Sequence, residues 1–149
     1  MVTSKLNLEK LMSLLSLVQE GAGDMRELGR LSREDFLIDR RNPAAAESFL
    51  RRSLEAVFDI GRHVLAKEYG EKDVEYKAVA RLLAERGVVG EECGVQLLKM
   101  AGYRNRMVHM YHQVAPEELY EIITGRLGDL DRFVREIQAF LERYRRSAP

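Results

Sequence analysis

The sequence predicts an all-α protein, an antiparallel helical bundle of four to five main helices. Apolar residues recur at three- and four-residue spacings through most of the chain, which is the period of an amphipathic helix. No segment shows the sustained alternation of a strand, and the stretches between the helical patterns are short. From a length of 149 residues with only three prolines, we expect residues 1–149 to form a single domain.

The first part of the chain is predicted to hold a long helix and then a short one. The long helix is indicated by an apolar stripe at helical spacing, made of Leu8, Leu11, Met12, Leu15 and Val18. Ser32, with Asp35 three residues later, resembles a capping box. We therefore expect a short helix to begin there and to carry Phe36 and Leu37.

A longer helix is predicted to start at Asn42 and Pro43, because Asn caps free amides and Pro tolerates the first helical position. Its apolar stripe consists of Leu50, Leu54, Val57, Phe58, Gly61, Val64 and Leu65. The stripe runs until Gly70. Gly61 inside it costs about 1 kcal/mol of helix propensity, so we expect it to permit the close approach of another helix.

Two more helices are predicted in the middle of the chain. Asp73 is the expected cap of the first, and Gly87 sits where a left-handed residue would end it. Glu91 and Glu92 suit the positive end of the second. One face of that helix turns from apolar to polar along its length and carries Leu98, Ala101, Asn105, Val108 and His112.

The last predicted helix begins at Pro116, followed by Glu117 and Glu118. Its apolar stripe is expected to be continuous and consists of Leu119, Ile122, Ile123, Leu130, Phe133, Val134, Ile137 and Leu141. This helix would complete the bundle.

Composition and charge exclude several classes of function. Lys and Arg number 24, as do Asp and Glu, so the net charge is +0 and any RNA contact must come from a local patch. The single Cys93 cannot form an internal disulfide. The start of the chain resembles neither a signal peptide nor a spanning segment, and the apolar runs are far below the roughly 20 residues of a bilayer helix. We expect a cytoplasmic protein with no membrane partner.

Chemically active side chains are densest in residues 103–112 (YRNRMVHMYH). On a helix, Asn105 and His109 would be adjacent, with Arg104 reaching back toward them. His can gain and lose a proton near neutrality, and the planar fork of Arg matches phosphate. These groups suit RNA cleavage, in which a base takes the proton of a 2′-hydroxyl and a fixed cation stabilises the charge on phosphorus. This chemistry requires neither a metal ion nor another cofactor.

The same residues also have a structural interpretation. A His beside Met107 and Val108 on a helix is more often a half-buried structural residue than a catalyst. Arg104 and Arg106 would be favourable cations at a helix C-terminus, by about 0.3–1 kcal/mol each. Spacing alone leaves both interpretations open.

The segment from Arg104 to Tyr111 resembles the signature of the HEPN superfamily in the form carried by HepT-like toxins. That signature is an Arg, four to six residues, a His, any residue and a Tyr, and Asn105 matches the polar residue directly after the Arg. Residues 34–36, 59–63 and 127–130 with Phe133 are also similar to the family, so the resemblance spans nearly the whole chain. It implies a helical bundle that dimerises with two motifs facing a shared cleft, and a metal-independent endoribonuclease toxin.

Carried over by position, the resemblance implies a role for each motif residue. Arg104 would hold the scissile phosphate, His109 would be the general acid or base, and Asn105 would orient the phosphate or the His. Tyr111 would be the residue that a nucleotidyltransferase antitoxin of the MntA type modifies with AMP. The added negative charge would repel RNA. The implied partners are a second copy of the chain, this antitoxin and an RNA substrate, with tRNA one candidate.

Four residues outside these roles are candidates for cleft support or RNA binding. Asp59 and His63 lie four apart and could bond to each other, while no third ligand lies at a spacing diagnostic of a metal site. Arg106 and His112 could assist at the cleft.

Other residues have a weaker functional interpretation beside a structural one. Tyr103 could stack on a base or pack in the core or an interface. Cys93 has acidic neighbours that disfavour a thiolate, so we expect it to be inert. A basic strip for phosphate, or merely a solvated face, is formed by Arg40, Arg41, Arg51 and Arg52.

Three rival functions remain at this stage. A non-catalytic HEPN module could serve as a binding or scaffold subunit for a nucleotidyltransferase. A plain four-helix interaction protein with no nucleic-acid role would fit the neutral net charge. A metal-dependent bundle enzyme is disfavoured, because the Glu-x-x-His pairs of di-iron bundles do not occur in the sequence.

Overall fold

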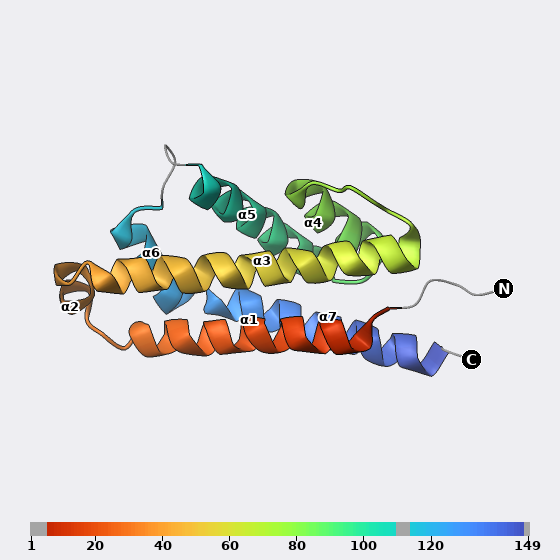
Figure 1. The fold of residues 1–149 in the computed structure, drawn as a ribbon, viewed down its shortest axis with the longest axis horizontal. Helices are drawn as coiled ribbons and strands as arrows, with labels where there is room; N and C mark the ends of the chain where they lie inside the picture. Colours follow the sequence, from red (N-terminus) through yellow and green to blue (C-terminus); the bar gives the residue numbers. More distant parts are fainter. Residues whose placement is uncertain (1–5, 110–113, 148–149) are drawn as a thin grey trace.

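The computed structural model describes residues 6–109 and 114–147, which form seven α-helices and no strand (Figure 1). The helices are α1 (Leu8–Leu28), α2 (Arg33–Ile38), α3 (Arg41–Tyr69), α4 (Tyr76–Glu85), α5 (Glu91–Val108), α6 (Pro116–Gly125) and α7 (Leu127–Ser147). The prediction of an all-α bundle is confirmed. The helix count exceeds four to five because two helices are short and because the expected C-terminal helix is divided near Gly125. Glycine is a poor helix former, which favours the break there.

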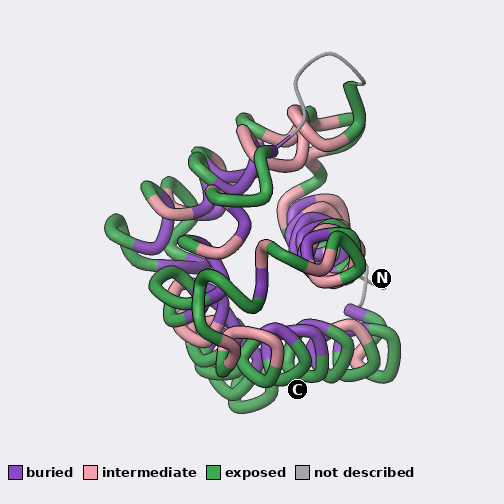
Figure 2. The backbone as a smooth tube through the Cα atoms, turned by 90° about the vertical axis from the view of Figure 1, so that its left-hand side faces the viewer, coloured by how far each residue is buried: buried purple, intermediate pink, exposed green. Residues whose placement is uncertain are grey.

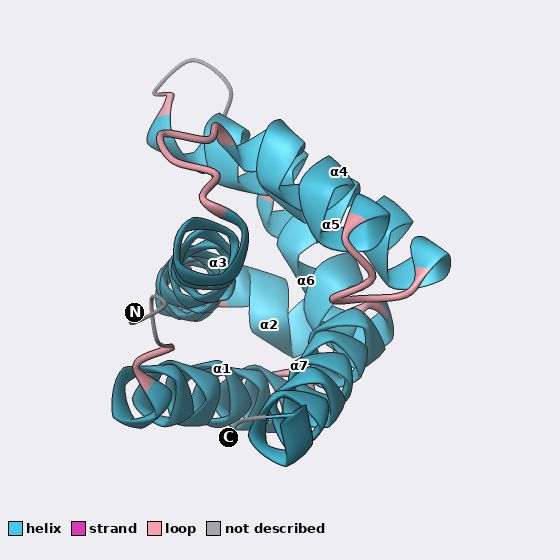
Figure 3. Ribbon diagram, turned by 90° about the vertical axis from the view of Figure 1, so that its right-hand side faces the viewer, coloured by secondary structure: helices cyan, strands magenta, loops and turns pink. Residues whose placement is uncertain are grey.

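The long helices are arranged around one core. α3 packs against α1 on one side and against α4 and α5 on another, while α7 contacts both α1 and α5. Neighbouring long helices run in opposite directions along the chain (Figure 1). Seen end-on, α1, α3, α5 and α7 surround a shared interior, and the buried residues face it (Figures 2 and 3). The bundle is antiparallel, as predicted.

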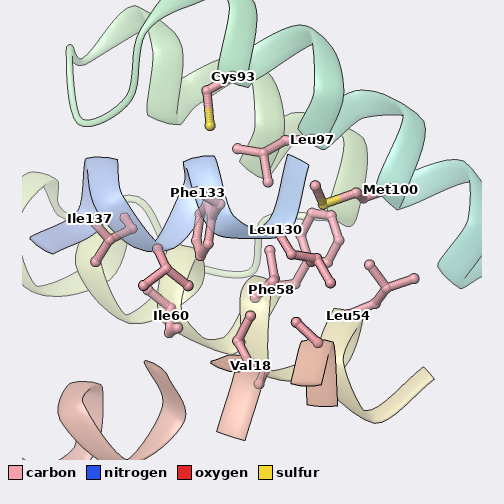
Figure 4. Packing of buried hydrophobic residues seen from close by; sticks show 14 of the residues in the cluster. Val18, Leu54, Phe58, Ile60, Cys93, Leu97, Met100, Leu130, Phe133 and Ile137 are labelled. Atoms are coloured by element: carbon pink, nitrogen blue, oxygen red, sulfur yellow. The ribbon is translucent and has the colours of Figure 1, made fainter. Parts of the chain in front are cut away.

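The core is built from the apolar stripes that the sequence predicts. Every member of the α3 stripe is buried, and Phe58 of α3, Phe133 of α7 and Leu97 of α5 belong to the same buried cluster (Figure 4). Three phenylalanines, Phe36, Phe58 and Phe133, are fully buried. Within the described ranges, no helix is both long and apolar enough to cross a membrane.

Two glycines bring helices into close contact. A Cβ on Gly61 would lie 2.7 Å from Val79 Cγ1 and 3.0 Å from Leu83 Cδ1, so α4 approaches α3 at this point. A Cβ on Gly21 would collide with the hydroxyl of the buried Ser53, where α1 meets α3. The prediction that Gly61 permits close helix packing is confirmed.

Two predicted helix starts are wrong. α3 begins at Arg41, whose backbone N–H donates to Asp39 Oδ1 at 3.0 Å, and Asn42 lies inside the helix. α4 begins at Tyr76, whereas Asp73 lies in the preceding loop with a φ of 56°. The residues at the N-cap positions are Arg40 for α3 and Glu75 for α4. The spacing of apolar residues does not define a helix start to within one or two residues. Ser32 caps α2 as predicted, accepting from the N–H of Asp35.

The predicted face of α5 is only partly buried. Leu98 and Val108 are 47% and 45% exposed, whereas Ala101 on the same face is buried. The buried residues of α5 are Cys93, Gly94, Leu97, Met100 and Ala101. α4 packs closely on this side, since a Cβ on Gly94 would lie 2.8 Å from Ala84 Cβ.

Candidate functional site

Arg104 lies in the last turns of α5, and two other helices hold its side chain. Its Nε donates to Glu55 Oε1 of α3 at 2.8 Å. Its guanidinium stacks over the ring of Tyr76, the first residue of α4, at 3.9 Å from the ring centroid. The Arg104 side chain is only 19% exposed. The motif arginine is therefore a partly buried side chain with a defined orientation.

Tyr76 is itself fixed by several neighbours. Phe58 of α3 meets its ring edge-on at 5.1 Å. The guanidinium of Arg62 stacks on the same ring at 4.2 Å from the centroid, and Arg62 Nε donates to the carbonyl of Val74 at 3.0 Å. The hydroxyl of Tyr76 lies 3.5 Å from Glu55 Oε1. Tyr76 therefore joins α3, α4 and α5 below the motif arginine.

The electrostatics around Arg104 favour a charged guanidinium. The hydrogen bond to Glu55 raises the pKa of Arg104 above its usual value. Partial burial and the negative charge of Glu55 raise the pKa of Asp59, which lies one turn further along α3. In the described part of the chain, Arg104 meets protein through the Nε bond to Glu55, the ring face of Tyr76 and a weaker contact with the Tyr76 hydroxyl. The edge formed by its two Nη nitrogens can therefore donate to a phosphate.

Asn105 lies inside the last turn of α5, and His109 follows directly after the helix. Asn105 lines a hollow of about 270 Å³ together with Glu75, Tyr76 and Lys77. α5 ends at Val108, and His109 has extended backbone angles with an exposed side chain. His109 therefore stands at the C-terminal boundary of α5, where its N–H still donates to the carbonyl of Arg106 at 3.3 Å, and its adjacency to Asn105 stays a prediction. Tyr111 and His112 lie outside the described residues.

Arg106 is engaged by α6. Its Nη1 and Nη2 donate to the two carboxylate oxygens of Glu118 at 2.9 and 2.8 Å. Glu118 is in the first turn of α6, so this bidentate pair connects the two ends of the segment that contains His109. A structural contact therefore accounts for Arg106, while its contact with RNA remains a prediction.

His63 and Asp59 do not pair with each other within the described chain. His63 Nε2 accepts a hydrogen bond from the backbone N–H of Asn7 at 2.9 Å. Partial burial, with Lys10 and Lys67 nearby, lowers the pKa of His63. His63 thus holds the start of α1 against α3.

The remaining candidates occupy ordinary structural positions. Arg40, Arg51 and Arg52 are exposed, and Arg41 pairs with Asp39 at 2.7 Å. Tyr103 is partly buried and packs against the core. Burial raises the pKa of the Cys93 thiol to about 12, with Glu136 adding to the effect, so this thiol stays protonated near neutrality. The described residues contain no group of three or more His, Cys, Asp or Glu side chains that could hold a metal ion.

The sequence identified the motif but missed the residues that hold it. Glu55, Tyr76 and Glu118 contact motif arginines, and none of them stands out in the sequence. Glu55 lies 49 residues from Arg104 along the chain, so only the tertiary fold brings the two together. The one available signal is that Glu55 precedes Asp59 by a single helical turn.

Comparison with known proteins identifies the family. The model of the family described as Ribonuclease HepT-like matches residues 18–137. The tRNA nuclease HepT of Aphanizomenon flos-aquae is 25% identical over 128 residues, which cover 85% of this chain and 86% of that protein. The mRNA nuclease HepT of Shewanella oneidensis is 27% identical over 90 residues, covering 60% of this chain and 68% of that one.

Solved structures share the fold. A tri-AMPylated HEPN toxin of Shewanella oneidensis in complex with MNT antitoxin matches with a TM-score of 0.79 and 20% identity, covering 87% of this chain and 97% of that one. The cytosolic protein YutE of Bacillus subtilis matches with a TM-score of 0.80 and 20% identity, covering 95% of each chain. The family match extends from α1 into α7. The resemblance predicted from the motif is thus confirmed, and the chain belongs to the Ribonuclease HepT-like family.

Proposed function

We propose that this chain is a metal-independent endoribonuclease toxin of a toxin–antitoxin pair. The observation that carries the proposal is that two other helices fix the side chain of the motif arginine, Arg104. Arg104 is bound by Glu55 and stacked on Tyr76, five residues before His109, in a chain of the HepT-like ribonuclease family. A partly buried arginine with its Nη edge available is the group that a transferring phosphate needs.

The proposed reaction needs only side chains of the motif. His109 takes the proton of the 2′-hydroxyl, and the 2′-oxygen attacks phosphorus. The bond from phosphorus to the 5′-oxygen breaks, leaving a 2′,3′-cyclic phosphate on one product and a 5′-hydroxyl on the other. Arg104 stabilises the charge that develops on the phosphate, and Asn105 orients the phosphate or the imidazole. The leaving 5′-oxygen takes up one proton.

In this scheme a homodimer supplies the donor of that proton: His109 of one copy accepts the 2′-hydroxyl proton, and the protonated His109 of the second copy donates to the leaving 5′-oxygen. One face of α5 carries Val95 and Leu98, which are 51% and 47% exposed, and a Cβ on Gly102 would meet nothing within 4 Å. Asn105 follows on the same face at helical spacing. Pairing this face with a second copy would cover the apolar residues and bring two motifs, each with a His109, to a shared cleft.

Modification of Tyr111 by a nucleotidyltransferase antitoxin is the proposed means of control. The Shewanella oneidensis HEPN toxin is tri-AMPylated in its complex with MNT antitoxin. An AMP group on Tyr111, two residues after His109, would add negative charge and bulk beside the motif. Like-charge repulsion would then keep the RNA backbone out.

Induced expression in cells tests the proposal. The wild type should arrest growth and shorten cellular RNA on a denaturing gel, whereas Arg104→Ala and His109→Ala should do neither. Coexpression of a cognate nucleotidyltransferase should relieve the arrest, and Tyr111→Phe should abolish that relief. Equal behaviour of the wild type and both alanine variants would refute the nuclease and leave a binding subunit.

A further inference from the structure

A side chain as long as that of Arg104 needs restraints if it is to present a fixed edge to a phosphate. Two contacts restrain the guanidinium of Arg104, and each restrains a different motion. Stacking on the Tyr76 ring at 3.9 Å fixes the plane of the guanidinium. The Nε bond to Glu55 at 2.8 Å fixes its rotation within that plane. Together they define the direction in which the two Nη nitrogens point.

The Tyr76 ring is a rigid support. Phe58, which is fully buried in the core, holds it edge-on at 5.1 Å. Arg62 stacks on it at 4.2 Å and is anchored in turn to the carbonyl of Val74 at 3.0 Å. The position of Arg104 is therefore tied to the hydrophobic core through one aromatic side chain.

We propose that Tyr76 and Glu55 are positioning residues for Arg104, and that they orient its Nη edge toward the scissile phosphate. The inference rests on the proposed function. Neither residue touches the reacting atoms. Tyr76 acts mainly through its ring, which lies against the guanidinium, while its hydroxyl interacts with Arg104 and lies 3.5 Å from Glu55 Oε1. Glu55 acts as a hydrogen-bond acceptor for Nε.

A steady-state cleavage assay of purified protein on an RNA substrate tests the proposal. Tyr76→Leu removes the ring and should lower kcat by about tenfold to a hundredfold with a smaller change in KM, because a misdirected arginine loses its transition-state contact. Tyr76→Phe keeps the ring and should stay within about twofold of wild type. Glu55→Ala should resemble Tyr76→Leu, and Glu55→Gln, which keeps an acceptor, should recover most of the rate.

The chain contains a matched control away from the motif. Arg86 stacks over the ring of Tyr69 at 5.2 Å and pairs with Glu71 at 2.7 Å, so it repeats the arrangement of Arg, Tyr and Glu. Tyr69→Leu and Glu71→Ala remove equivalent contacts. These variants should leave both kcat and KM unchanged.

A second readout does not depend on activity. The Nε–H group of Arg104, assigned by its loss in Arg104→Lys, should give a distinct and slowly exchanging NMR signal in the wild type. Tyr76→Phe should keep this signal, whereas Tyr76→Leu and Glu55→Ala should lose it. Glu55 is 43% exposed, so the Glu55 variants report on positioning even if Tyr76→Leu does not fold.

The outcomes separate this inference from the proposed function. A wild type that fails to cleave any RNA overturns the nuclease, and the Nε–H signal then decides positioning by itself. Wild-type kcat in folded Tyr76→Leu and Glu55→Ala overturns the positioning role. An Arg104 Nε–H signal that exchanges freely in the wild type overturns it as well.

Discussion

His63 is a hydrogen-bond acceptor that joins the start of α1 to α3. Its Nε2 accepts from the N–H of Asn7, the residue that also caps α1 through its side chain. Protonation of Nε2 would remove the acceptor and place a positive charge near Lys10 and Lys67. His63 therefore couples the stability of the fold to pH.

We expect His63 to make the protein less stable at acid pH. Its pKa is lowered from 6.5 in the folded state, so its stabilising effect is present above pH 6.5 and is lost as the pH falls through the lower folded value. His63→Gln keeps an acceptor that does not titrate. Chemical unfolding at pH 7 and pH 5 should show a smaller loss of unfolding free energy in this variant than in wild type. An identical loss in both proteins would assign the pH dependence to other groups.

At the same scale, the proposed reacting residues can be found in the sequence, whereas the residues that contact them cannot. The spacing of Arg104, Asn105 and His109 is local, so it can be found in the chain itself. Glu118 lies 12 residues from Arg106 across a helix boundary, and Glu55 lies 49 residues from Arg104. Such contacts depend on how helices pack, and charged residues are common on every helix surface.

At the scale of the elements, close helix contacts set the geometry of the bundle. α4 approaches α3 at Gly61, and α5 packs against α4 at Gly94, where an added Cβ would lie 2.8 Å from Ala84 Cβ. Tyr76 and Arg104 are thereby carried into stacking distance on α4 and α5. The spacing of these helices therefore determines the site.

Gly61→Ala tests the α3–α4 contact. The added methyl would lie 2.7 Å from Val79 Cγ1, and overpacking of this kind costs about 1–3 kcal/mol, against a gain of about 1 kcal/mol in helix propensity. We expect the free energy of unfolding to fall by up to about 2 kcal/mol. Gly23→Ala in α1 is the control, since its Cβ would meet nothing within 4 Å, and it should stabilise the protein by about 0.5–1 kcal/mol. Stabilisation by both substitutions would contradict a tight α3–α4 contact.

The Arg106–Glu118 pair connects α5 to α6. The two side chains are 40% and 30% exposed, so solvent screening limits their interaction to about 0.5–1 kcal/mol. A double-mutant cycle with Arg106→Ala and Glu118→Ala, followed by thermal or chemical unfolding, measures this coupling. The exchanged pair Arg106→Glu with Glu118→Arg should restore part of it. A coupling energy of zero would show that the pair does not hold α5 to α6.

Helix identity was predictable from the sequence, whereas several boundaries and one buried face were not. Capping at Ser32 and the left-handed Gly87, with a φ of 73°, are local signals and were correctly placed. The starts of α3 and α4 were wrong because neighbouring residues compete for the capping position. On α5, apolar residues on two faces made the periodicity ambiguous, and its packing against α3, α4 and α7 decides which face is buried.

At the scale of the whole molecule, a neutral chain must bind RNA through a local surface. The net charge is +0, so salt should weaken RNA binding only through the few arginines near the motif. The face of α5 that carries Val95 and Leu98 runs into Asn105, so pairing of two copies through it would assemble this surface from both chains.

Leu98→Glu tests pairing through α5. In a dimer paired through this face, the new carboxylate at position 98 would lose its water and lie near the same carboxylate of the second copy, and both effects are unfavourable. We therefore expect a dimeric wild type and a monomeric variant. Analytical ultracentrifugation of both proteins measures this, and circular dichroism checks that the helices are retained. Leu17→Glu on α1, at a residue that is 42% exposed, is the control and should remain dimeric. A dimer in the Leu98 variant would assign pairing to another surface.

The most direct test of the central claim is cleavage of end-labelled RNA by purified protein in the presence of EDTA. We predict that the wild type cuts, leaving a 2′,3′-cyclic phosphate, and that Arg104→Ala and His109→Ala reduce the rate by at least about a hundredfold while retaining the fold. RNA left intact by the wild type at every pH tested, or equal cutting by all three proteins, would contradict an Arg104–His109 ribonuclease.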